Sequence, residues 1–205
     1  MPRDKSLSHE KVKRAIRDEF LEKGYENASV RSIGARAGMT SAGLYRHYAD
    51  KEAMFNAMVE PLLADIERWV DHHVKNQYDR LNHDVPGNEI CGDNFLDMVR
   101  EVILPRREEF ILLMMKSSGT RHENFLHDFV VVNQQHVMEA LKYLKEKGYP
   151  TMDVGEEELH MLLSAYVTAC FEPVIHNYDG EKVDKYLNTV QAFFMPGWMK
   201  IMGIK

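Results

Sequence analysis

Cysteine is scarce in this chain of 205 residues, which contains only Cys91 and Cys170. The two lie far apart and form no Cys-x-x-Cys pair, so neither a disulfide framework nor a zinc ribbon is indicated, and we expect reduced thiols. Long apolar runs are also lacking, since stretches such as Met161 to Phe171 fall well short of the roughly 20 residues that span a bilayer. The N-terminal residues show no apolar segment of the kind found in signal peptides. We therefore expect a soluble, cytoplasmic protein.

Recognisable catalytic motifs are missing as well. The sequence has no Gly-rich phosphate loop, no Gly-x-Ser-x-Gly, no set of metal ligands and no persuasive pair of carboxylates. Glu172 and His176 are spaced one helical turn apart and could ligate a metal, but without a third ligand we interpret them as a polar pair. The sequence thus indicates no enzyme, no metal site and no cofactor.

The distribution of charge is more informative than the net charge of −6. Residues 1–48 carry ten Lys and Arg against six Asp and Glu, a balance of +4, which leaves −10 for the remaining 157 residues. A basic segment on an otherwise acidic chain indicates a contact surface for a polyanion such as nucleic acid.

The N-terminal quarter is patterned as a series of helices. Val12, Ile16 and Phe20 recur every fourth residue, which predicts a first amphipathic helix. Three polar residues stand where the following helices begin and can cap them, and Gly38 can take the left-handed conformation that ends the second helix. These N-caps are Ser29 for the second helix, Thr40 or Ser41 for the third and Asp50 for a longer fourth helix from Lys51 to about Tyr78.

Two short helices separated by a turn that contains Gly, with a longer helix before them, match the helix-turn-helix arrangement. In that arrangement the second short helix enters the major groove of DNA. The outward residues of this helix would be Ser41, Ala42, Gly43, Tyr45, Arg46 and His47. A generic helical hairpin with a polar surface is the alternative interpretation.

Lys51 is out of place by the electrostatics of helices. A cation in the first turn opposes the helix dipole, which favours Asp or Glu at that end. A DNA phosphate docked at the same helix terminus would supply the missing anion. The alternative is a solvated lysine offset by Glu52.

The run YENASVRSIGARAGMTSAGLYRHYADKEAMF, Tyr25 to Phe55, resembles the DNA-binding signature of the TetR family of bacterial transcriptional regulators. The resemblance covers about the first quarter of the chain. Two positions depart from the family pattern: Gly34 stands where Ala is usual, which we expect to loosen the second helix slightly, and Tyr48 stands where Phe is usual.

The resemblance implies an all-α homodimer with an N-terminal three-helix DNA-binding domain and a C-terminal helical domain for ligand binding and dimerisation. The implied boundaries are residues 1–50 for the DNA-binding domain, 51–78 for a connecting helix and 79–205 for the C-terminal domain. Positions that match DNA contacts in the family are Ser29, Arg31, Thr40, Ser41, Ala42, Gly43, Tyr45, His47 and Lys51. Of these, Arg31, Ser41 and Ala42 are better placed for base edges, and Tyr45, His47 and Lys51 for phosphates. Arginine is the common bidentate reader of guanine, which favours Arg31.

Beyond residue 78, Pro and Gly residues divide the chain into further segments of helical pattern. A loop is expected from Asp79 to Asn94, followed by helices at about 92–104, 106–117, 121–147, 156–178 and 180–203. The last two have broad apolar coverage, so they could form a four-helix dimer interface with a second copy. The residues that suggest this interface are Tyr166, Phe171, Phe193, Phe194 and Trp198.

Methionine and aromatic residues at helical spacing in the C-terminal half fit either plain core or an adaptable apolar pocket. If a pocket exists, an apolar or amphipathic effector would contact Phe110, Met114, Phe129 and Tyr166. Three classes of function therefore remain: a regulator, such as a repressor, released from a palindromic DNA operator by a small molecule; a DNA-binding regulator that responds to no ligand; and, with least support, an enzyme with an unrecognised site.

Overall fold

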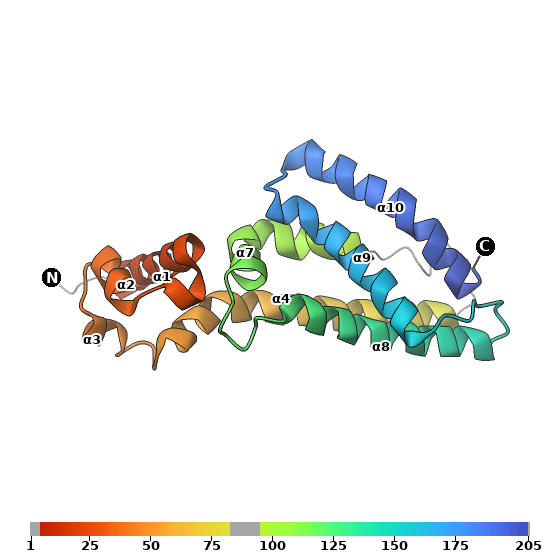
Figure 1. Cartoon of the computed structure of the whole chain (residues 1–205), viewed down its shortest axis with the longest axis horizontal. Coiled ribbons are helices and arrows are strands. Elements are labelled where there is room, and N and C mark those ends of the chain that lie inside the picture. Colours follow the sequence, from red (N-terminus) through yellow and green to blue (C-terminus); the bar gives the residue numbers. More distant parts are fainter. Residues whose placement is uncertain (1–4, 83–94, 205) are drawn as a thin grey trace. The chain divides into compact units, whose positions relative to one another are not determined.

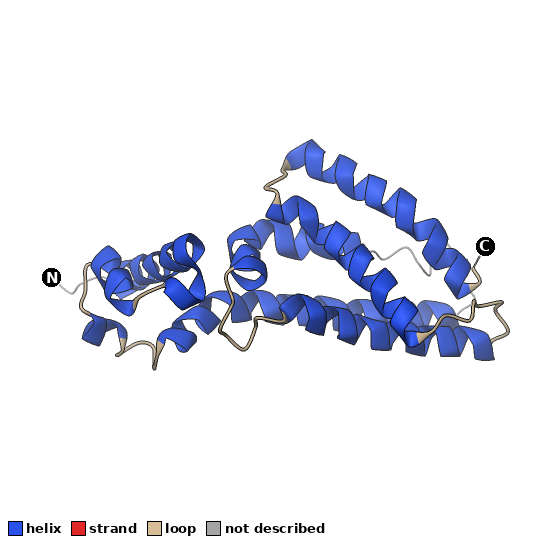
Figure 2. Cartoon of the chain, viewed as in Figure 1, coloured by secondary structure: helices blue, strands red, loops and turns tan. Residues whose placement is uncertain are grey.

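The computed structural model describes residues 5–82 and 95–204, and within these ranges the chain consists of helices and loops, without a strand (Figure 2). This confirms the predicted all-helical class. The α-helices are α1 (Lys5–Asn27), α2 (Val30–Ala37), α3 (Ser41–Leu44), α4 (Lys51–Asn82), α6 (Phe95–Met98), α7 (Arg107–Met115), α8 (Phe125–Glu146), α9 (Glu156–Ile175) and α10 (Gly180–Met202) (Figure 1). A π-helical turn (Val99–Ile103) and a 3-10 turn (Leu104–Arg106) join α6 to α7.

The predicted loop at 79–94 falls mostly outside the described residues, and α4 continues to Asn82. None of the described helices is both long enough and apolar enough to cross a membrane.

The chain forms two compact units, and their boundary lies inside α4. Unit 1 comprises residues 1–64 and 106–125, and unit 2 comprises residues 65–105 and 126–205. Helices α1–α3 therefore share a unit with the first part of α4 and with α7. The domain boundaries expected at residues 50 and 78 remain a prediction. Within α4, the boundary between the two compact units lies after residue 64.

The core of unit 1 is apolar and includes residues distant in sequence. Phe20 of α1 and Phe55 of α4 are fully buried, and their ring centres lie 5.2 Å apart in an edge-to-face arrangement. Leu112 and Leu113 of α7 belong to the same core cluster as the helix-turn-helix residues Ile33 and Leu44. Burial of this apolar surface provides the main stabilisation of the unit, and α7 contributes to it directly.

Unit 2 contains an aromatic cluster around Phe95. The ring centre of Phe95 lies 5.5 Å from that of Phe129, 5.7 Å from that of Tyr166 and 5.4 Å from that of Phe171. Tyr166 also packs on Trp198 of α10, with ring centres 5.9 Å apart. Aromatic pairs at such distances contribute beyond the area they bury, so α6, α8, α9 and α10 are held together by these rings.

The helix ends in unit 1 follow the predicted capping residues. The Ser32 amide donates to Ser29 Oγ at 3.1 Å, the Gly43 amide to Thr40 Oγ1 at 3.1 Å, and the Ala53 amide to Asp50 Oδ1 at 2.7 Å. Each bond satisfies an amide that a helix start leaves without an intrahelical partner. Gly38 ends α2 in the left-handed conformation, with φ 71°.

At position 34 there is no space for a side chain, and this, rather than backbone flexibility, accounts for the glycine. A Cβ atom at this position would lie 2.8 Å from the carbonyl oxygen of Met39 and 3.4 Å from the amide nitrogen of Ser41. The Met39 amide also donates to the carbonyl oxygen of Gly34 at 2.9 Å. The expectation that Gly34 loosens α2 is therefore corrected: its missing side chain lets the turn before α3 approach α2 closely.

Replacement of Gly34 by Ala tests this close approach. Replacing an exposed glycine in a helix by alanine normally stabilises the protein. At position 34, however, the added methyl group meets main-chain atoms that cannot rotate away. We expect Gly34→Ala to lower the free energy of unfolding by about 1–3 kcal/mol, as overpacking does in cores, measured by thermal unfolding. Gly43→Ala is the control, because a Cβ there meets nothing closer than 3.5 Å. Equal stability of the two variants would contradict the steric role of Gly34.

Candidate nucleic-acid interface

The start of α2 is anchored on the buried carboxylate of Glu19. This side chain, on α1, is fully buried. The Ser29 amide donates to Oε1 at 3.3 Å, and the Ser32 hydroxyl donates to Oε2 at 2.7 Å. Lys23 Nζ lies 2.9 Å from Oε1, and Arg36 Nε lies 3.0 Å from Oε2. Both carboxylate oxygens of Glu19 are thus paired, and these contacts fix α2 to α1 near both ends of α2.

Burial and hydrogen bonding shift the pKa of the Glu19 carboxyl in opposite directions. Burial by itself raises the pKa, because it disfavours the charged form. The hydrogen bonds from the Ser32 hydroxyl, Lys23 and the Ser29 amide lower it by more, together with the charge of Lys23, so the net shift is downward. Glu19 therefore remains ionised at neutral pH and acts as a fixed negative charge inside unit 1.

Lys51 is bound by main-chain carbonyl groups. Its ammonium donates to the carbonyl oxygens of Tyr25, Glu26 and Ala28 at 2.8, 3.3 and 3.3 Å, and lies 4.3 Å from the centre of the Tyr25 ring. An ammonium group has three N–H donors, so these acceptors use all of them. The sequence argument placed a phosphate beside Lys51. In this structure its partners are carbonyl groups at and just beyond the end of α1, so Lys51 ties α4 to α1, and its contact with a phosphate stays a prediction.

The other predicted DNA contacts lie on α2, on α3 and in the turn that follows α3. Arg31 is exposed, and within the described part of the chain no hydrogen bond or ion pair is recorded for its side chain. The rest of this set is exposed or half-buried: Ser29, Thr40, Ser41, Ala42, Gly43, Tyr45 and His47. The α-helical part of the expected recognition helix ends at Leu44, and Tyr45 to His47 form a hydrogen-bonded turn.

The two arginines of α2 differ in what they can do. Arg36 is paired with Glu19 and with Glu22, so its guanidinium is committed to the protein. Arg31 keeps its planar fork open to a partner outside unit 1. Arg46, which follows α3, is also exposed and adds positive charge to the same segment. It was recognised as outward-facing from the sequence but was not included among the predicted contacts.

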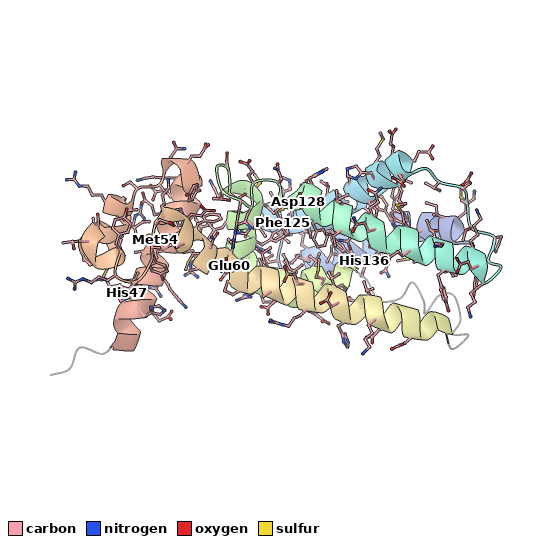
Figure 3. The ribbon with its side chains drawn as sticks, turned by 90° about the horizontal axis from the view of Figure 1, so that it is seen from below. His47, Met54, Glu60, Phe125, Asp128 and His136 are labelled. Carbon is pink, nitrogen blue, oxygen red and sulfur yellow. The ribbon has the colours of Figure 1, made fainter. Side chains whose placement is uncertain are left out.

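Residues after α7 also contact α1 and α4 within unit 1. The Tyr25 amide donates to the carbonyl oxygen of Lys116 at 2.9 Å, just beyond the kink at Gly24. Arg121 pairs with Glu60 of α4, which Figure 3 labels together with Phe125 at the start of α8. The segment 116–125 thus holds both α1 and α4. Nothing in the residue pattern of this segment signals these contacts, because they join positions about 60 to 90 residues apart.

The four predicted ligand contacts are divided between the units. Phe110 and Met114 belong to unit 1, and Phe129 and Tyr166 belong to unit 2. Phe110 is fully buried and Met114 half-buried, while Phe129 and Tyr166 are each 8% exposed and both pack on Phe95. Within unit 2, Phe95 thus brings Phe129 and Tyr166 together, and within unit 1 Phe110 and Met114 lie one turn apart on α7.

The Glu172 and His176 pair has the expected polar character. His176 Nε2 lies 2.8 Å from Glu172 Oε2 within α9. Within residues 5–82 and 95–204 no group of three His, Cys, Asp or Glu side chains is arranged to hold a metal ion.

Comparison with known proteins gives a family match for the segment just described. Residues 14–58 match the family model described as bacterial regulatory proteins, tetR family. The HTH-type transcriptional repressor AcnR of Corynebacterium diphtheriae is 22% identical over 186 residues, which cover 91% of this chain and 90% of that protein. The nucleoid occlusion factor SlmA of Pasteurella multocida is 36% identical over 56 residues, 27% of this chain and 28% of that protein.

Two solved structures share the fold over almost the whole chain. NalD, the secondary repressor of the MexAB-OprM multidrug efflux pump in Pseudomonas aeruginosa, has a TM-score of 0.53 at 14% sequence identity. The alignment covers 96% of this chain and 97% of the NalD chain. The fatty acid degradation regulator FadR from Bacillus halodurans has a TM-score of 0.51 at 16% sequence identity. Its alignment covers 96% of this chain and 100% of the FadR chain.

The anchoring role of Glu19 predicts a pH-dependent loss of stability in Glu19→Gln. At neutral pH we expect the free energy of unfolding to fall by about 1–3 kcal/mol, because the amide cannot replace a carboxylate that accepts several donors. The pKa of Glu19 is lowered in the folded state, so its contribution is complete above the ordinary value of 4.5 and is lost as the pH falls through the lower folded value. Urea unfolding across this range should show the two proteins converging at acid pH.

Glu22→Gln is the matched control for this change. Glu22 lies on the same helix and also pairs with Arg36, but its side chain is 57% exposed, so its pairing is screened by solvent. A loss of stability equal to that of Glu19→Gln would contradict the anchoring role of the buried carboxylate.

Proposed function

Because the chain belongs to the TetR family of bacterial transcriptional regulators, we propose that it is a cytoplasmic repressor that binds a palindromic operator as a homodimer. A small-molecule effector releases it from the operator. The relatives AcnR and NalD are named as repressors, which supports repression over activation.

The observation that carries this proposal is the open surface of α2, α3 and the turn after α3. The caps at Ser29 and Thr40 and the Glu19 anchor hold both helices in place. Arg31, Tyr45 and His47 stand exposed on this rigid frame. A frame fixed before binding lets side chains meet DNA without a large ordering cost.

We assign different tasks to the exposed residues. Arg31, Ser41 and Ala42 approach base edges, where guanine offers two acceptors to an arginine fork. Tyr45 and His47 contact phosphates, and Ser29, Thr40 and Gly43 shape the approach of the main chain to the DNA backbone. Lys51 supports this surface from within the protein through its three carbonyl partners.

An apolar face on α9 and α10 supports dimerisation. Met161 and Leu162 of α9 are 69% and 42% exposed, and Phe193 of α10 is 77% exposed. Large apolar side chains exposed on two neighbouring helices favour a protein interface, and a two-fold dimer presents the same residues on both copies. Of the five residues from which the interface was predicted, Tyr166, Phe171 and Trp198 are buried inside unit 2, and Phe194 is half-buried against Tyr166 with ring centres 5.2 Å apart.

The effector is proposed to bind in unit 2 beside Phe129 and Tyr166. The indole N–H of Trp198, which packs on Tyr166, is buried and has no hydrogen-bond acceptor among the described residues. The Nδ1 atom of His136 on α8 is likewise buried without a partner in this part of the chain. Unpaired polar atoms, one of them beside aromatic rings, suit an amphipathic ligand. Because binding of the effector and binding of the operator are coupled, each must lower the affinity of the protein for the other by the same factor.

Selection from random double-stranded DNA tests the proposed function. The full chain should enrich an inverted repeat whose half-sites are about one DNA turn, ~34 Å, apart or slightly more. Enrichment of no sequence at moderate salt, or of a site without two-fold symmetry, would count against a dimeric operator-binding protein.

Arg31 is predicted to read one base position. Arg31→Ala should weaken operator binding by about 1–3 kcal/mol and relax the preference at that position. Arg31→Lys is the matched control, because it keeps the charge and loses the bidentate fork. It should recover affinity for random DNA but not the base preference in competition binding assays. An equal loss of affinity for operator and random DNA in Arg31→Ala would show that Arg31 contacts a phosphate.

Phe193 is predicted to lie at the dimer interface. Phe193→Glu places a charge that must lose its water without gaining a partner, once in each copy, which costs several kcal/mol. Light scattering should therefore show monomers, with operator binding lost. Val132→Glu, at an apolar residue of α8 that is 47% exposed, is the control and should remain dimeric. A dimeric Phe193→Glu variant would place the interface on another face.

A further inference from the structure

A cleft in unit 1 is lined by α1, by the first part of α4 and by residues 106–109, and it encloses about 480 Å³. This volume lies within the range of about 300–1,000 Å³ that is typical of small-molecule sites. The cleft belongs to the unit that contains the helix-turn-helix and is distinct from the aromatic cluster of unit 2.

Positive charge dominates the lining of the cleft. It contains five cations (Lys11, Lys13, Arg14, Arg17 and Arg106) and two carboxylates (Glu10 and Glu109), a net charge of +3. The whole chain, in contrast, has a net charge of −6. Such a concentration of one sign in a concave site attracts a ligand of the opposite sign.

Several of these cations are available to a ligand. Among the described residues, the side chains of Lys11, Lys13 and Arg14 form no ion pair or hydrogen bond. Arg17 Nε lies 3.0 Å from Glu108 Oε2, yet this buried N–H is not aligned for a hydrogen bond to any described acceptor.

One wall of the cleft is apolar. Ala57, Met58 and Pro61 of α4 line it, and Met58 is buried while Pro61 is exposed. Inorganic phosphate would gain nothing from these side chains, whereas an organic anion would place its apolar body against them and its charged group among the cations. Methionine adapts readily to the shape of such a body.

We propose that this cleft is a binding site for an organic anion with an apolar body, such as an aromatic sulfonate or carboxylate. Lys13 and Arg14 hold the anionic group, and Ala57, Met58 and Pro61 contact the apolar body. The site is separate from the effector site of unit 2, and its occupancy does not depend on the proposed operator.

The test uses the full chain and the fluorescent probe anilinonaphthalene sulfonate, with neutral phenylnaphthylamine as the probe that lacks the anionic group. The double variant Lys13→Gln with Arg14→Gln should weaken sulfonate binding by about tenfold or more, because it removes two charged donors. Binding of the neutral probe should stay unchanged. The control is Lys142→Gln with Lys145→Gln, two exposed lysines of α8, which should bind the sulfonate as the wild type does. Probe bound elsewhere contributes equally to all proteins and cancels in this comparison.

A second variant guards against a loss of binding caused by misfolding. Glu10→Gln removes a carboxylate from the rim of the cleft and should strengthen sulfonate binding by about two- to fivefold, since like-charge repulsion at a surface has this size. The proposal is overturned if the wild type does not bind the sulfonate, or if the Lys13 and Arg14 variant binds it equally well. It is also overturned if both probes lose affinity together or if Glu10→Gln gives no gain.

Discussion

The carboxylate of Glu19 is the only charged group among the described residues that is fully shielded from solvent. It accepts from the amide and the hydroxyl at the start of α2 and from two cations, so its desolvation is offset by hydrogen bonds to both oxygens. The cations Lys23 and Arg36 are themselves partly exposed and retain some hydration. Through this one group α1 determines where α2 begins, and the position of α2 in turn determines the turn and α3.

Local features of the DNA-binding segment were predictable because they depend on neighbours in sequence. Ser29, Thr40 and Asp50 cap amides three residues ahead, and Gly38 adopts the left-handed conformation required at its position. The C-terminal helices α7 to α10 were located approximately, since Pro and Gly interrupt the apolar periodicity there, but the helix expected at 92–104 is α6 followed by a π-helical turn, and α8 begins at Phe125 rather than at 121. The family resemblance supplied the assignment as a DNA-binding regulator and the predicted DNA contacts, which composition alone would have left open.

Contacts between distant residues were not predictable from the pattern. Lys51 was interpreted through its own helix dipole, but its partners are carbonyl groups more than 20 residues earlier. Gly34 was interpreted as flexible, although it is limited by Met39 in the next turn. Phe193 and Phe194 have the same residue type and adjacent positions, and only their places on α10 show that one is exposed and the other packs on Tyr166.

The composition of unit 1 has a consequence for the order in which the protein acquires its structure during synthesis. The unit requires residues 106–125, and Leu112 and Leu113 lie in its core. A nascent chain that has emerged only as far as α4 therefore lacks part of that core, and the apolar surfaces of α1 and α4 stay open to water until α7 has left the ribosome. The helix-turn-helix comes first in the sequence, yet its unit is completed only after more than half of the chain has been translated.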